Sequence, residues 1–142
     1  MDYEVVYKAF LSKMTDDVWA SWEEYEVYED LRTLLEAAIP RFKFPLTSLD
    51  RDDNGFISPL NNQEIEILAS YMKVEWLNRT VLSWENIRPL YEERDFSQAN
   101  LLHRFTVLLE SEDKRARRLE SLYYRAANHT PYQYGKLAGG NK

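Results

Sequence analysis

Residues 61–80 read NNQEIEILASYMKVEWLNRT and carry the clearest helical pattern of the chain. Asn61 stands three residues before Glu64, the spacing of a capping box, where each side chain accepts a hydrogen bond from the other residue's backbone N–H. Apolar residues then recur at the spacing of one helix face: Ile65, Leu68, Ala69, Met72 and Trp76, followed by Thr80. A second set widens that face: Ile67, Tyr71, Val74 and Leu77. The stretch therefore predicts a helix that is covered on more than one side and forms the centre of the domain.

Two further helical segments are expected before this centre. The first covers residues 3–14, where apolar side chains recur every four residues. Residues 15–17, Thr-Asp-Asp, resemble a cap cluster, so a second helical stretch is expected to begin there and to end near Pro40. The acidic and aromatic run of residues 23–30 is expected to interrupt this second stretch.

Two helices are also expected after the centre. Ser83 is predicted to start a short helix that ends or kinks near Pro89. Ser97 then opens the longest segment, which runs to about Ala127 and spans roughly 45 Å if it is unbroken. The polar patch at residues 111–113 leaves open whether this segment is one helix or two.

The segment between the second helix and the central one reads as irregular or hairpin structure. Pro45 and Pro59 exclude a helix interior, and residues 53–55, Asp-Asn-Gly, suit a tight turn. Apolar residues stand on both sides of that turn. A β-hairpin or loop insertion is therefore expected near residues 46–60.

Together these elements predict an all-α fold, a small helical bundle with one long C-terminal helix and the insertion just described. The 142 residues are 44% hydrophobic, which suits one domain with a buried core. Residues 1–127 are expected to form the helical domain, and residues 128–142 an extended C-terminal tail.

Composition excludes several classes of function. The formal charge of −6 argues against general affinity for DNA or anionic membranes, which are bound through excess positive charge. The chain has no cysteine, so disulfides, thiolate metal sites and Cys nucleophiles are excluded. No apolar run approaches the ~20 residues of a membrane span, and Asp2 and Glu4 disfavour a signal peptide.

Residues 50–58, DRDDNGFIS, match the first half of an EF-hand calcium loop. Asp50, Asp52 and Asn54 stand at the first three ligand positions, and the expected glycine follows. The position that normally holds a bidentate Glu is Asn61, and no second loop exists to pair with this one. The favoured interpretation is an Asx-rich turn without metal, and calcium binding by Asp50, Asp52 and Asn54 is the alternative.

No catalytic constellation is visible. The only two histidines, His103 and His129, have no metal-ligand or triad spacing to another residue. Adjacent carboxylates, such as those at residues 23–24 and 92–93, point apart on a helix and usually mark a solvated face. The sequence lacks P-loop, dinucleotide and nucleophile-elbow motifs. We therefore expect no enzyme activity and no cofactor.

Charge is unevenly distributed along the chain. Residues 1–30 hold nine acidic side chains against Lys8 and Lys13. The long C-terminal helix carries a compact basic patch: Lys114, Arg115, Arg117 and Arg118. The patch is interpreted as a solvated face, a contact to an acidic neighbouring subunit or a weak nucleic-acid site. An acidic end and a basic patch on one molecule suit head-to-tail self-association, and the aromatic content of 14% is typical of interfaces.

Several segments together indicate a family resemblance. They are LLEAAIPRF at 34–42 with Phe44-Pro45, EIEILASYM at 64–72 with EWL at 75–77, and DFSQAN at 95–100. Over residues 10–125 the chain resembles the small neck proteins of tailed bacteriophages, the head-to-tail connector or head-completion adaptors. The resemblance is a pattern over the whole chain and contains no single diagnostic motif.

The resemblance implies a helical, non-enzymatic virion subunit that forms a homo-oligomeric ring, commonly a dodecamer, in the phage neck. Such a ring lies between the portal protein and the tail or stopper proteins, and genomic DNA passes through it without specific binding. The subunit would be made in the host cytoplasm. Terminal segments of such connectors often reach the adjacent ring, so Tyr132 and Tyr134 of the tail join the basic patch as candidate partner-binding residues.

Two other classes of function stay open at this stage. One is a single EF-hand-like calcium-binding module built on residues 50–58. The other is a small regulatory protein that binds a partner through its basic helix.

Overall fold

The computed structural model describes residues 1–15, 17–87 and 96–128. The elements follow one another as α1 (Glu4–Leu11), α2 (Glu24–Ala38), the short 3₁₀ helix η1 (Ile39–Arg41), α3 (Asn62–Ile87) and α4 (Phe96–Asn128). In these three ranges there are isolated bridges at Asp2–Gly55 and Arg51–Phe56 but no strand. The all-α prediction is confirmed. The expected hairpin near residues 46–60 is not found, and that insertion is a loop.

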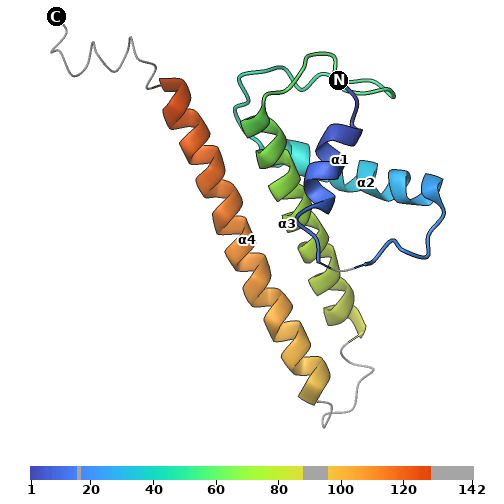
Figure 1. Cartoon of the computed structure of the whole chain (residues 1–142). Helices are drawn as coiled ribbons and strands as arrows, with labels where there is room; N and C mark the ends of the chain where they lie inside the picture. Colours follow the sequence, from blue (N-terminus) through green and yellow to red (C-terminus); the bar gives the residue numbers. More distant parts are fainter. Residues whose placement is uncertain (16, 88–95, 129–142) are drawn as a thin grey trace, which may run out of the picture.

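Helix α3 forms the centre of the domain, as its sequence pattern predicted. Helix α4 packs along one side of α3, while α1 and α2 pack against its other side (Figure 1). Leu68, Met72 and Leu77 are fully buried in this arrangement, and Tyr71 is almost completely so. Covering α3 from two directions therefore creates the core.

The start of α3 is set by the predicted capping box. Asn61 N donates to Glu64 Oε1 at 2.9 Å, and Glu64 N donates to Asn61 Oδ1 at 2.9 Å. From there the helix continues through Ser83 to Ile87, so the predicted restart at Ser83 is wrong. No glycine or proline interrupts residues 62–87, and nothing in this stretch weakens the helix enough to end it earlier.

Helix α2 begins later than the sequence suggested. Its start is a capping box made by Glu23 and Glu26, and the helix then runs without a break to Ala38. The predicted start at residues 15–17 and the predicted interruption at 23–30 are both wrong. The segment before α2 is attached to that helix through Trp19. The Trp19 side chain is buried, and its Nε1 donates to Asp30 Oδ2 at 2.8 Å.

Helix α4 is one continuous helix of 33 residues. The polar patch that left its continuity open is held by ion pairs. Lys73 Nζ lies 3.2 Å from Glu112 Oε1, and Arg117 Nε lies 3.0 Å from Asp113 Oδ2. Because Glu112 pairs with a lysine of α3 and Asp113 with an arginine of α4 itself, the helix passes through the patch without ending.

The loop between η1 and α3 is attached to the beginning of the chain. Phe56 N donates to Met1 O at 2.7 Å, and Met1 N donates to Phe56 O at 2.6 Å. Gly55, at φ 154°, makes this approach sterically feasible, because a Cβ there would lie 2.0 Å from Met1 O. The turn predicted at residues 53–55 thus exists, but the first residues of the chain take the place of a partner strand.

Candidate interaction surfaces

The four basic residues singled out in the sequence are all exposed on α4: Lys114, Arg115, Arg117 and Arg118. Arg117 pairs with Asp113 one turn earlier, and the hydrogen bond raises the pKa of its guanidinium. Within the part of the chain that the structure describes, the other three make no ion pair. Tyr132 and Tyr134, the remaining predicted partner-binding residues, lie outside the described residues.

Two of these cations belong to a longer exposed row on α4. Its members recur every three or four residues and are all exposed: Val107, Ser111, Lys114, Arg118, Leu122 and Arg125. The buried residues of α4, Ala116, Glu120 and Tyr123, have different registers on the helix and belong to its α3-facing side. We call the exposed row the basic stripe. Leu122, an apolar member of this row, is 45% exposed.

An acidic and aromatic surface lies at the beginning of α2. Trp22, Tyr25 and Tyr28 are 41%, 66% and 40% exposed, and the carboxylates of Glu24 and Glu29 are exposed among them. These five residues form what we call the acidic aromatic surface. This end of α2 extends away from α3 on the side opposite α4 (Figure 1). The two charged surfaces therefore lie on opposite sides of the subunit.

The EF-hand-like segment uses its oxygen atoms for local hydrogen bonds. Asp52 Oδ1 accepts from Asn54 N at 2.8 Å and from Gly55 N at 3.2 Å, which is an Asx turn. Asn61 stands at the last ligand position, and its Oδ1 accepts the hydrogen bond from Glu64 N in the capping box of α3. Among residues 1–15, 17–87 and 96–128, no group of three or more His, Asp or Glu is arranged to hold a metal. Asp50 is exposed and does not complete such a group.

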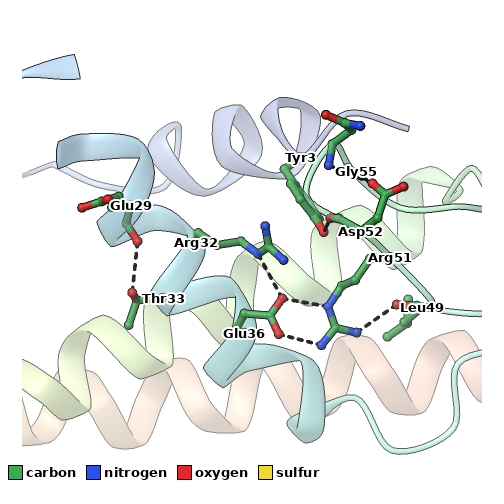
Figure 2. A network of polar contacts seen from close by, with 10 residues as sticks. Tyr3, Glu29, Arg32, Thr33, Glu36, Leu49, Arg51, Asp52 and Gly55 are labelled. Atoms are coloured by element: carbon green, nitrogen blue, oxygen red, sulfur yellow. Dashed lines mark hydrogen bonds and ion pairs between the residues drawn. The ribbon is translucent and has the colours of Figure 1, made fainter. Parts of the chain in front are cut away.

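A network of partly buried ion pairs joins the same loop to α2 (Figure 2). Arg51 donates to Glu36 through Nη2 at 2.6 Å and Nε at 2.7 Å, and to Leu49 O at 3.0 Å. Arg32 Nε donates to the same carboxylate at 3.1 Å, and its guanidinium lies 4.3 Å from the centre of the Tyr3 ring. The hydrogen bond from Arg51, followed by that from Arg32, overcomes desolvation and lowers the pKa of Glu36 to about 2.

This network predicts how stability depends on pH. The ordinary pKa of a Glu is 4.5, so ionised Glu36 contributes stability that is complete above pH 4.5 and is lost as the pH falls toward about 2. Its side chain is 38% exposed, so water weakens the effect. In Glu36→Gln we expect lower stability at neutral pH and a flatter decline in acid, measured by urea unfolding across a pH series. The matched variant Glu29→Gln should keep the wild-type pH dependence, and an equally steep decline in Glu36→Gln would contradict this.

Two buried carboxylates join the central helices to the loop that follows η1. Tyr123 OH donates to Glu64 Oε2 at 2.6 Å, and Tyr71 OH donates to Glu120 Oε1 at 2.6 Å. Tyr124 OH also donates to Glu120. We call these five residues the carboxylate–tyrosine cluster. Burial and the neighbouring carboxylates raise the pKa of Tyr123 and Tyr124 to about 12, so both tyrosines stay protonated as donors.

The cluster holds the backbone of residues 43–47, which we call the clamped loop. Leu46 N donates to Tyr123 OH at 2.8 Å, and Thr47 N donates to Glu64 Oε2 at 3.2 Å. Sequence reasoning missed this site, because its partners are separated by up to 80 residues and no local spacing links them. The one local signal is that Glu64 already belongs to a capping box.

Comparisons of the chain with protein-family models, with curated proteins and with solved structures give no match. Across the described ranges, no helix combines the length and apolar character that crossing a membrane requires.

Proposed function

We propose that the protein is a non-enzymatic structural subunit that associates head-to-tail into a ring in the neck of a tailed bacteriophage. One observation carries the association: the basic stripe and the acidic aromatic surface lie on opposite sides of α3. The basic stripe of one copy can therefore face the acidic aromatic surface of the next copy. Such a contact repeats from subunit to subunit and closes into a ring when the rotation permits.

The chemistry of the two surfaces supports this association. Lys114 and Arg118 make no ion pair within the described residues, and Glu24 and Glu29 are exposed around Tyr25. Opposite charges at an interface steer subunits together and fix their register. Exposed Trp and Tyr side chains supply the apolar contact area that charges alone lack.

The placement in a phage neck rests on the family resemblance of residues 10–125. A connector ring lies between the portal protein and the tail or stopper proteins, and the tail with Tyr132 and Tyr134 would contact an adjacent ring. The net charge of −6 is consistent with a channel through which DNA passes without specific binding.

Charge reversal tests the head-to-tail contact directly. We expect Lys114→Glu/Arg118→Glu to weaken self-association at least about tenfold, because acidic faces then oppose each other. Glu24→Lys/Glu29→Lys should have the same effect, because basic faces then oppose each other. A mixture of the two variants should associate again, since each new acidic stripe meets a new basic surface. Sedimentation velocity and negative-stain imaging measure the outcome.

The control Lys8→Glu/Lys13→Glu makes the same change in net charge on α1, which adjoins the acidic side of the subunit, and should not weaken association. A wild-type chain that stays monomeric at all concentrations overturns the proposal. Failure of the mixture to associate overturns the head-to-tail contact. For the neck assignment, rings that bind a phage portal protein support it, and fully infectious particles lacking this protein contradict it.

A further inference from the structure

The clamped loop presents two large apolar side chains to solvent. Phe44 is 71% exposed and Leu46 is 69% exposed, more than any other large hydrophobic side chain that the structure describes. The two side chains stand two residues apart on one loop, and contiguous exposed apolar area of this kind often marks a protein–protein contact. The loop therefore has the composition of a contact site.

The backbone of this loop is held in place from beneath. Lys43 N donates to Glu120 Oε2 at 3.2 Å, and Phe44 N donates to Tyr124 OH at 3.0 Å. With the bonds from Leu46 and Thr47, every backbone N–H of residues 43–47 is used, since Pro45 has none. A loop that is ordered in advance loses little conformational entropy when its side chains are bound.

A groove lies between α1, the middle of α2 and the 53–54 turn. This open groove has a volume of about 360 Å³. Three tyrosines, four carboxylates and Arg32 line it, and Tyr28 is the most exposed of the three rings. A cavity of about 150 Å³ is enough to hold benzene, so this groove has room for a phenyl ring.

Charge also matches between the loop and the groove. Lys43 is exposed beside Phe44, and exposed Arg125 of the basic stripe lies one residue beyond Tyr124, whose ring contacts Phe44 edge to face. The groove is acidic, because its lining holds four carboxylates, Asp2, Glu4, Glu29 and Asp53, against the single cation Arg32. The clamped loop adjoins α4 and the groove adjoins the acidic aromatic surface through Tyr28 and Glu29.

We infer that Phe44 of one copy packs into this groove on the next copy against the exposed ring of Tyr28, with Lys43 facing the carboxylates that line the groove. This inference rests on the proposed head-to-tail association and supplies its apolar anchor. Buried aromatic anchors of this kind contribute most of the affinity at many protein interfaces. The occupant of the groove is thus a second copy of this chain.

The test combines a truncation with a cross-link in the full-length chain. We expect Phe44→Ala to weaken self-association at least about tenfold, whereas Ile57→Ala, at another exposed apolar side chain, should change it less than about twofold. A photoreactive benzoylphenylalanine at position 44 should cross-link to peptides containing Tyr3, Tyr7 or Tyr28 of another copy, identified by mass spectrometry in isotopically mixed samples.

The outcomes separate this inference from the proposed function. If the charge-reversed variants associate as a mixture but position 44 cross-links elsewhere, or Phe44→Ala has no effect, the anchor is wrong and the head-to-tail contact stands. If the wild-type chain stays monomeric, both are wrong. If Ile57→Ala weakens association as much as Phe44→Ala, the specific role of Phe44 is overturned.

Discussion

Replacing Glu64 by alanine is expected to lower the free energy of unfolding by about 4 kcal/mol. Its side chain is completely buried and accepts hydrogen bonds from Asn61 N, Thr47 N and Tyr123 OH. Alanine would leave these donors without an acceptor inside the protein, which costs more than the bonds themselves contribute. The same substitution removes half of the capping box that starts α3. Urea unfolding followed by circular dichroism measures the loss.

The matched control lies two residues further along the same helix. Glu66 is half exposed and pairs with Lys13 Nζ at 2.5 Å. A pair of this kind contributes at most about 1 kcal/mol, so Glu66→Ala should be nearly neutral. Tyr123→Phe keeps the ring and removes only the hydroxyl, and we expect an intermediate loss of about 1.5 kcal/mol. Equal losses in Glu64→Ala and Glu66→Ala would show that the carboxylate–tyrosine cluster does not stabilise the fold.

The second large effect is expected at Leu68. This residue is completely buried in the first half of α3, the helix against which α1, α2 and α4 all pack. Leu68→Ala removes apolar contacts and leaves a cavity, which lowers stability by about 3 to 4 kcal/mol when the surroundings cannot collapse. Collapse is restricted here because helices cover α3 from two directions. Thermal and urea unfolding both report the loss.

Leu82 provides the comparison for Leu68. It lies on the same helix, but its side chain is 50% exposed at the groove between α2 and α3. The same chemical change, Leu82→Ala, should therefore cost less than about 1 kcal/mol. If both variants lose the same stability, α3 is not the buried centre that its contacts indicate.

Local sequence patterns predicted the start of a helix correctly where one capping signal was clear. The box of Asn61 and Glu64 is a contact between residues three apart, so its spacing alone predicts the bonds that start α3. The start of α2 was misplaced because residues 15–17 carry the more familiar cap residues, whereas Glu23 and Glu26 form the box. Ser83 was read as a new start, although an uninterrupted helix can contain a serine on its exposed side.

The insertion illustrates a different limit. Residues 53–55 do form a tight turn, as their composition predicted, but a hairpin needs two strands that pair with each other over several residues. Here the residues on either side make a single bridge, Arg51 to Phe56, and Met1 pairs with Phe56 instead. The competing partner, Met1, lies 55 residues earlier in the sequence than Phe56. The residues of the turn carry no information about a contact with such a distant residue.

By itself the sequence determined the helical class, the central position of α3, the exposed cations of α4 and the acidic character of the first 30 residues. Each of these follows from composition or from spacings within a few turns of one helix. Three features are visible only in the tertiary structure. The two charged surfaces lie on opposite sides of α3, Tyr123 donates a hydrogen bond to Glu64, and the side chain of Phe44 is exposed to solvent. These features depend on contacts between residues up to 80 positions apart, which arise from packing and leave no local periodicity.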